Sequence, residues 1–328
     1  YYNESPVFYD ENEVKEFCIE ELDAIIVGSD AVFRLNPRYD PINIAKAILR
    51  RKQAPAFFSS ERVSPYWLPW QSKNENKKVI KASVAASSMG TYFYFLSPKL
   101  LKDLRICLAD FDFISVRDRW TEKMIKFISK GKIHPIFCPD PAFSLTANFQ
   151  IPADENPDID LSDTILVSGN FRSKWLEKFV AQAHRSGFSV ASLPNPHNDF
   201  SYPEVDINIP LPLSPLEWFS LLGKASAYVG IRFHALVLCM VQHTPVINVD
   251  SHLRSRIIRS SSKMYDLCQR AGIQDRYYTL KKIHSTSPVQ LLDVLFDAQS
   301  LNRANSYADF ANKQFSDLID NVLNLVLD

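Results

Sequence analysis

The sequence predicts an α/β protein with two domains. Short apolar runs typical of buried strands alternate with longer amphipathic or apolar segments typical of helices. A length of 328 residues fits two domains of ordinary size. The stretch 146–163 is polar and rich in Pro and Asp, so we expect an N-terminal α/β domain at 1–150 and a C-terminal α/β domain, ending in helices, at 151–328.

Composition narrows the class of protein. Charged residues make up 23 % of the chain and the formal net charge is zero, which gives no support for nucleic-acid binding. The five cysteines are scattered without metal-type spacing, as expected of reduced thiols in a cytoplasmic protein. The sequence has no apolar run long enough to span a membrane and no GxGxxG or Walker A loop. These features argue against a membrane-spanning protein and against a dinucleotide or P-loop nucleotide enzyme.

The first clear strand, Leu22–Val27, ends at Gly28, Ser29 and Asp30. Small residues at a strand end allow close approach to the backbone, and the Asp30 carboxylate can accept hydrogen bonds from sugar hydroxyls. A plain helix N-cap is the alternative for Asp30. Because residues 1–20 are polar and hold no Met, we expect the chain to begin inside a domain whose first βα unit is missing or removed.

The second strand of this domain, Val79–Ala86, leads to a polar turn that holds Ser88. A hydroxyl at a strand end suits hydrogen bonding to a sugar, and a simple turn is the competing interpretation. Before this strand, Tyr66, Trp67 and Trp70 have rings that can stack on a sugar, although packing in the core or a loop is the simpler explanation.

A third strand, Phe111–Val116, leads to Arg117. Ligands of open α/β sheets collect at the carboxyl ends of strands, so Arg117 is a candidate for binding an anion. The alternative is an ion pair with Asp112 or Asp118. Asp140, between two prolines, is a candidate substrate contact or an ordinary turn residue.

Other segments have the periodicity and start signals of helices or the apolar character of strands. Pro98 after Ser97 and the Ser214/Glu217 capping box mark two helix starts. We expect helices at Ile42–Arg51, Ser97–Ala109, Arg119–Ser129, Lys174–Ser186, Ser214–Leu222, Ser287–Ala298 and Ser306–Leu327, and strands at Ile136–Cys138, Thr164–Val167 and Phe188–Leu193.

The most informative stretch is Ala227–Asp250. It predicts a strand at Ala227–Gly230, an apolar helix at Phe233–Val241 and a strand at Val246–Val249, which together form a β–α–β unit. Arg232 and His234 lie where the first strand gives way to the helix, an arrangement that favours an anion and a proton transfer. An Arg paired with a local Asp and a His that caps the helix are the alternatives.

These segments resemble, in the same order, the motifs of the polysaccharide pyruvyl transferase family. The resemblance covers about Leu22 to Gly272 and lacks one feature, a Lys just beyond the strand that ends near Val249; Arg254 or Arg256 is the candidate replacement. The matching blocks are Gly28-Ser29-Asp30, Ser88 with Gly90, Ile114–Asp118 with Arg117, Asp140-Pro141, and Gly230, Arg232, His234 and Pro245.

The resemblance implies a glycosyltransferase-B-like fold of two Rossmann-like domains, with substrates in the cleft between them. It implies transfer of the pyruvyl group of phosphoenolpyruvate to a sugar, which ends as a cyclic ketal while phosphate leaves. In this scheme the N-terminal domain binds the acceptor through Gly28, Ser29, Asp30 and Ser88, and the C-terminal domain binds the donor. His234 is the candidate general acid or a phosphate ligand, Arg232 and Arg117 hold the donor, and Asp30 or Asp140 is the candidate base.

We expect no metal and no cofactor besides phosphoenolpyruvate as co-substrate. The expected partners are this donor and a sugar or glycan acceptor; a lipid-linked acceptor would bring peripheral membrane association. Two other functions stay open. One is a glycosyltransferase of the same fold that uses a nucleotide-sugar. The other is a non-catalytic protein that binds glycan or scaffolds a biosynthetic complex.

Overall fold

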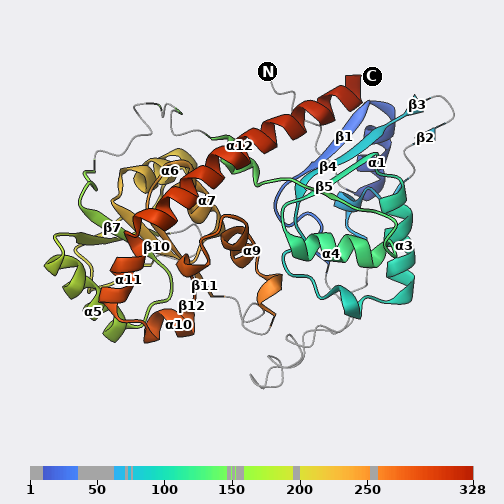
Figure 1. Cartoon of the computed structure of the whole chain (residues 1–328). Coiled ribbons are helices and arrows are strands. Elements are labelled where there is room, and N and C mark those ends of the chain that lie inside the picture. The colour runs from blue at the N-terminus through green and yellow to red at the C-terminus, as the bar shows by residue number, and fades with distance from the viewer. Residues whose placement is uncertain are drawn as a thin grey trace. The chain divides into compact units, whose positions relative to one another are not determined.

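The computed structural model of the chain describes residues 10–35, 63–70, 73–74, 77–145, 149, 152, 159–194, 200–251 and 258–327. The helix expected at 42–51 and the candidate donor residue Arg254 lie outside these residues. Two compact units are present, one formed by Tyr1–Pro139 with Asp317–Asp328 and the other by Asp140–Ser316 (Figure 1). The division falls ahead of the boundary expected near residue 150, and the end of the C-terminal helix belongs with the first unit.

The first unit contains a parallel sheet of four strands in the order β1-β4-β5-β6. The chain enters it through a helix that the sequence did not predict, which Asp10 caps by accepting hydrogen bonds from the backbone N–H groups of Asn12 and Glu13. The strands are β1 (Ala24–Gly28), β4 (Ile80–Ala86), β5 (Phe113–Val116) and β6 (Ile136–Phe137), and the helices are α1 (Glu11–Glu20), α3 (Pro98–Ala109) and α4 (Arg119–Ile128). Short 3-10 helices η1 (Pro65–Trp67) and η2 (Phe93–Phe95) and a hairpin of β2 (Lys73–Asn74) with β3 (Lys77–Lys78) lie in the connections.

The second unit contains a parallel sheet of six strands in the order β12-β11-β10-β7-β8-β9. These strands are β7 (Thr164–Ser168), β8 (Ser189–Ser192), β9 (Ile207–Asn208), β10 (Ala227–Gly230), β11 (Val246–Asp250) and β12 (Tyr277–Thr279). The helices are α5 (Ser173–Arg185), α6 (Pro215–Lys224), α7 (Phe233–Val241), α9 (Lys263–Arg270), α10 (Leu280–Ser285), α11 (Pro288–Leu295) and α12 (Ala298–Leu327), with 3-10 turns η3 (Pro141–Ser144), η5 (Arg259–Ser261) and η6 (Gln274–Arg276).

Each face of the six-stranded sheet has its own apolar cluster. One cluster joins Tyr228 and Val246 of the sheet to α6, α7, α9 and α12, and the other joins Val229 and Val249 to α5, α10 and α11. Successive residues of a strand point to opposite faces, which explains why neighbouring residues of β10 belong to different clusters. The predicted α/β fold class with two Rossmann-like units, each built on a parallel sheet with helices, is therefore confirmed.

The local predictions succeed best where the chain has clear punctuation. β10 and α7 have the predicted bounds, and β11 extends one residue further than expected, to Asp250. The Ser214 capping box and the start of α3 after Ser97 are also confirmed. Among the helices that the structure describes, none combines the length and the apolar character needed to cross a membrane.

Candidate functional site

The turn from β10 into α7 places Arg232 at the N-cap position of the helix. A guanidinium has hydrogen-bond donors and no acceptor, so the Arg232 side chain cannot cap the N–H groups of the first helical turn. The turn is anchored by the backbone, since the Ile231 N–H donates to the Ser168 carbonyl at 3.0 Å. A helix start with a cation at its N-cap is electrostatically suited to an anion.

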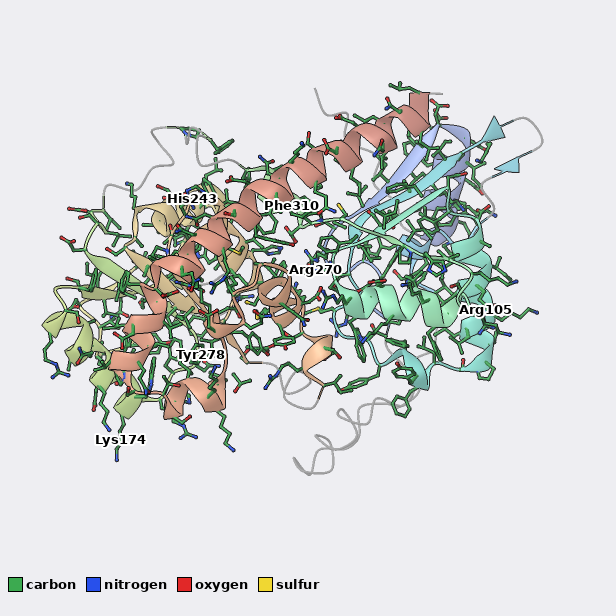
Figure 2. The ribbon with its side chains drawn as sticks, in the orientation of Figure 1. Arg105, Lys174, His243, Arg270, Tyr278 and Phe310 are labelled. Carbon is green, nitrogen blue, oxygen red and sulfur yellow. The ribbon has the colours of Figure 1, made fainter. Side chains whose placement is uncertain are left out.

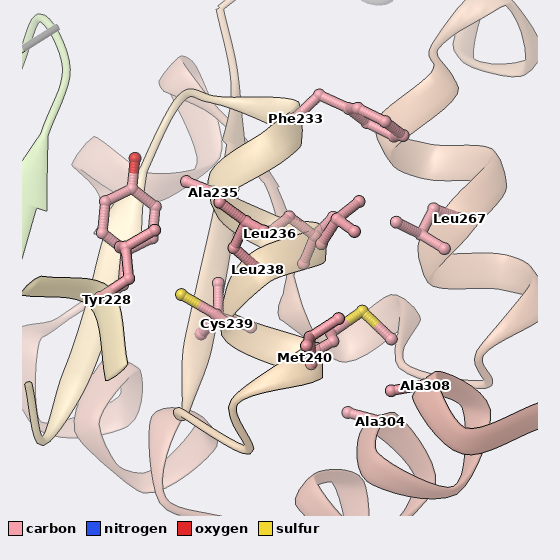
Figure 3. Packing of buried hydrophobic residues seen from close by; sticks show 14 of the residues in the cluster. Tyr228, Phe233, Ala235, Leu236, Leu238, Cys239, Met240, Leu267, Ala304 and Ala308 are labelled. Atoms are coloured by element: carbon pink, nitrogen blue, oxygen red, sulfur yellow. The ribbon is translucent and has the colours of Figure 1, made fainter. Parts of the chain in front are cut away.

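Helix α7 is a rigid support for this turn because nearly all of it is buried. His234 is exposed, whereas the other residues of the helix are buried. Figure 3 shows the helix packed between Tyr228 of β10 and Leu267, Ala304 and Ala308 of other helices. The core therefore fixes the position from which the His234 ring projects.

Asp140 lies beside His234. Its carboxylate Oδ2 is 3.9 Å from His234 Nε2, and the Asp140 side chain is 4 % exposed against 52 % for His234. Asp140 also caps η3 by accepting a hydrogen bond from the Ala142 N–H at 3.0 Å. The structure thus brings two of the predicted site residues together within the second unit, and Asp140 is both a turn residue and a neighbour of the imidazole.

A third cationic side chain near this turn, Lys263, was not identified from the sequence. The Nζ atom of Lys263 lies 4.5 Å from the ring centroid of Phe233, the residue between Arg232 and His234. Lys263 opens α9, and the N-cap of α9, Ser262, donates a hydrogen bond from Oγ to Asp250 Oδ2 at the end of β11 at 2.5 Å. This tether between the helix start and the strand end brings Lys263 to the turn.

The corresponding edge of the first unit holds Arg117, whose side chain is 1 % exposed. Its Nη2 donates to Asp30 Oδ1 at 2.6 Å, and this ion pair joins two predicted site residues that lie far apart in the sequence. Asp30 has a left-handed backbone with φ 56°, and its carbonyl accepts a hydrogen bond from the Ser87 N–H at 2.8 Å. This ties the loop after β1 to the loop after β4. The Asp30 side chain remains 61 % exposed.

Ser88 is wholly buried in a turn network. Its N–H donates to Thr121 Oγ1 at 2.8 Å, and its carbonyl accepts from Thr91 Oγ1 at 2.7 Å. Asp118, the N-cap of α4, accepts from Ser87 Oγ at 2.8 Å and from the Thr121 N–H at 2.8 Å. These contacts account for Ser88 as a turn residue, and its part in substrate binding stays a prediction.

The remaining predicted positions differ in their surroundings. Gly28 is exposed, and a Cβ at Gly28 would meet no atom within 4 Å, so the strand end opens to free space. The Ser29 N–H donates to the Val84 carbonyl at 2.9 Å. Trp67 is wholly buried and stacks on Phe33 with ring centroids 4.4 Å apart, which makes it a core residue.

A cavity of about 640 Å³ lies at the other end of the first unit's sheet. Its lining includes Asp112 and Phe113 at the start of β5 and Lys130 after α4. Ligands of parallel sheets collect at the carboxyl ends of strands, so this cavity is not the site that the motifs indicate. Within the described ranges, no group of three or more His, Cys, Asp or Glu side chains is arranged to hold a metal ion.

Comparison with known proteins places the chain in a family. Residues 1–252 match the family model described as polysaccharide pyruvyl transferase. No curated protein sequence gives a significant match.

Several solved structures are similar to the chain in fold, at TM-scores below 0.5. One is a Listeria monocytogenes protein described as a UDP-N-acetylglucosamine 2-epimerase, with a TM-score of 0.48 and 12% identity over 96% of this chain and 78% of that one. Another is MnaA of S. aureus in a structure with UDP, with a TM-score of 0.45 and 13% identity over 98% of this chain and 83% of that one. The E. coli heptosyltransferase WaaC with ADP has a TM-score of 0.39 and 12% identity over 88% of this chain and 77% of that one.

The family match alone identifies the chain. It covers most of the sequence and includes Asp30, Arg117, Asp140 and the turn with Arg232 and His234. The chain belongs to the polysaccharide pyruvyl transferase family, a family of transferases.

Proposed function

We propose that this protein transfers the pyruvyl group of phosphoenolpyruvate to a sugar of a glycan or glycan precursor. The products are a cyclic pyruvate ketal on the sugar and inorganic phosphate. Family membership supports the proposal, and one structural observation carries it: Arg232, His234 and Lys263 gather at the start of α7, at the carboxyl end of β10.

The donor has the charge that such a turn favours. Phosphoenolpyruvate has about three negative charges near neutral pH, spread over a carboxylate and a phosphate. Arg232 offers a planar fork of donors, Lys263 a compact ammonium, and the first turn of α7 its backbone N–H groups. In this proposal Lys263, whose Nζ lies 4.5 Å from the ring centroid of Phe233, takes the part of the donor-site Lys expected from the family resemblance.

His234 supplies the proton that the reaction needs. The methylene carbon of the enol gains this proton, a sugar oxygen bonds to the adjacent carbon, and a second hydroxyl of the same sugar displaces phosphate. The two hydroxyl protons that are lost balance the one on the new methyl group and the one on the departing phosphate. The half-exposed side chain of His234 and the Asp140 carboxylate 3.9 Å from its Nε2 support a role for His234 as the general acid. A phosphate-binding role for His234 is the alternative.

The acceptor side of the proposal rests on the loop after β1. Asp30 is exposed enough to reach a sugar hydroxyl as hydrogen-bond acceptor or base, and the space beside Gly28 is open. Arg117, buried against Asp30, would position that carboxylate, and its direct contact with the donor stays a prediction. A lipid-linked acceptor would bring the protein to a membrane surface as a peripheral protein.

Phosphate release tests the proposal. Purified protein is incubated with phosphoenolpyruvate and a panel of glycosides, and we expect phosphate to appear only when an acceptor with two suitable hydroxyls is present. The product should gain the mass of a pyruvate ketal, and chelation of metals should leave the rate unchanged. Turnover with a nucleotide-sugar in place of phosphoenolpyruvate would instead establish a glycosyltransferase, and acceptor binding without turnover would establish a glycan-binding protein.

A further inference from the structure

Three polar side chains lie in a row beneath the turn that holds Arg232. Gly230 pairs with Ser168 of β7 on one side and with Asn248 of β11 on the other. Paired residues of parallel strands direct their side chains to the same face, so Ser168 and Asn248 flank Gly230. Tyr228 is on that face as well, because it precedes Gly230 by two residues. Its cluster shows that this is the face covered by α7.

The Tyr228 hydroxyl fills the gap between Ser168 and Asn248. A Cβ at Gly230 would lie 2.1 Å from Tyr228 Oη, so the phenol occupies the space that a side chain at this position would need. Figure 3 shows the hydroxyl directed towards the end of α7 that carries Phe233. Burial raises the pKa of Tyr228, and the nearby Ser168 side chain and Arg232 backbone oppose this rise only in part, so the hydroxyl keeps its proton.

These three side chains are buried, and some of their polar atoms lack an ordinary hydrogen bond. Ser168, Tyr228 and Asn248 each have 0% exposure. Among the described residues, neither amide atom of Asn248 has a hydrogen-bond partner, and the Ser168 and Tyr228 hydroxyls make no hydrogen bond of ordinary geometry. A buried polar group without a partner costs free energy, and structural networks in protein cores are normally satisfied.

We infer that Ser168, Tyr228 and Asn248 form a buried polar layer that supports donor binding from behind, as positioning residues that do not touch the donor. Their dipoles can orient towards the anion that Arg232 and the start of α7 hold, and in a low-dielectric interior such dipoles act strongly on a nearby charge. The inference rests on the proposed function, because it takes phosphoenolpyruvate as the anion. The free energy lost in the ligand-free protein by the unpartnered Asn248 amide is then the cost of a preorganised site.

Asn248→Leu gives a test in which a structural and a functional role predict opposite results. Leu has a similar size and removes both unpartnered amide atoms, so we expect an unchanged or higher Tm in the absence of ligand. We expect the same variant to lose most of the increase in Tm that phosphoenolpyruvate gives the wild-type protein. Its KM for phosphoenolpyruvate should rise about tenfold, with a smaller change in kcat. Asn248→Ser, which has a hydroxyl in place of the amide, should show more protection than Asn248→Leu.

Tyr228→Phe is the second variant, since it keeps the ring and removes a single oxygen. Tyr278→Phe is its matched control, because Tyr278 is also a buried tyrosine of the same unit but belongs to the cluster on the opposite face (Figure 2). We expect Tyr228→Phe to weaken protection by phosphoenolpyruvate and by inorganic phosphate, and Tyr278→Phe to leave both unchanged. If Asn248→Leu does not fold, Tyr228→Phe decides the question by the same measurements.

The outcomes separate this inference from the proposed function. Wild-type protein that gains no protection from phosphoenolpyruvate would refute the proposed donor itself. Wild-type protein that is protected, with variants protected equally well, would overturn only the polar layer. A loss of ligand-free stability in Asn248→Leu and Tyr228→Phe, together with unchanged donor binding, would show that the row is structural.

Discussion

The two sheet edges that carry the family's arginines differ in how their side chains are held. In the first unit, Arg117 is 1 % exposed and pairs with Asp30 at 2.6 Å, among loops that are tied to one another by hydrogen bonds. In the second unit, His234 is 52 % exposed, and the Asp140 carboxylate lies 3.9 Å from its Nε2. A similar pattern of an arginine at a strand end thus has two outcomes. In the first unit, Arg117 is buried in a hydrogen-bonded network and its partner Asp30 is exposed. In the second unit, the start of a buried helix exposes the His234 imidazole.

The largest expected effect is that of His234→Ala. If the second edge carries the proton transfer, this change should lower kcat for phosphate release by roughly 100- to 10 000-fold, the usual contribution of a general acid. His243→Asn is the matched control, since His243 is an exposed histidine just beyond the other end of α7, in a left-handed conformation that Asn tolerates (Figure 2). Equal loss in both variants would mean that the effect comes from α7 in general, and no loss in His234→Ala would remove the acid role.

Lys263→Ala should have the next largest effect, mainly on donor binding. A charge-assisted contact to a phosphate or carboxylate contributes about 1.5–3 kcal/mol, so the KM for phosphoenolpyruvate should rise by roughly 10- to 100-fold while kcat changes less. Lys174→Ala, at an exposed lysine of α5, should leave the KM unchanged. An unchanged KM in Lys263→Ala would show that Lys263 does not bind the donor.

Asp30→Asn probes the closed network of the first unit and should reduce stability more than a surface substitution does. It replaces the carboxylate that pairs with the buried Arg117 guanidinium by a neutral amide, and we expect a loss of about 1–3 kcal/mol in the free energy of unfolding. Asp320→Asn, at an exposed position of α12 assigned to the same unit, is the control. Urea unfolding monitored by circular dichroism measures both. Equal stabilities would mean that the pair contributes little.

Local sequence signals predict well the bounds of the strands and the helix that hold Arg232 and His234 in the second unit. An apolar run bounded by Gly230 at one end and by Thr244 and Pro245 at the other fixes β10, α7 and β11 almost to the residue. These boundaries depend on backbone conformations and periodicities that single residues determine, so no knowledge of tertiary contacts is needed.

Contacts between distant segments are what the sequence does not reveal. Lys263 reaches the Phe233 ring only because Ser262 bonds to Asp250 at the end of another strand, and nothing in the local pattern of 258–270 indicates this. The partner of Arg117 was expected to be Asp112 or Asp118, yet Arg117 forms an ion pair with Asp30, which follows β1, two strands away in the sheet and distant in sequence. The orphaned amide of Asn248 likewise follows from strand register.

The smallest expected effect is a difference in stability between the two units. Labelling of their buried cysteines measures it, because a buried thiol reacts only after its unit unfolds locally or globally. Cys107 lies in the first unit, and Cys239 and Cys268 lie in the second. Burial raises the pKa of Cys107 to about 11 and that of Cys268 to about 12, and it raises the pKa of Cys239 as well. At pH 8 the native thiols are therefore protonated and unreactive, and labelling requires opening.

We expect Cys107 to be labelled at a lower urea concentration than Cys239. The first unit has a smaller sheet and buries the charged Lys81 in its core, whereas Cys239 lies in a helix that is apolar on almost every side. Labelling with a thiol reagent at increasing urea, followed by mass spectrometry of the peptides, assigns each midpoint. Midpoints that coincide would show one cooperative transition. A lower midpoint for Cys239 would reverse the comparison and make the helix that carries His234 the less stable platform.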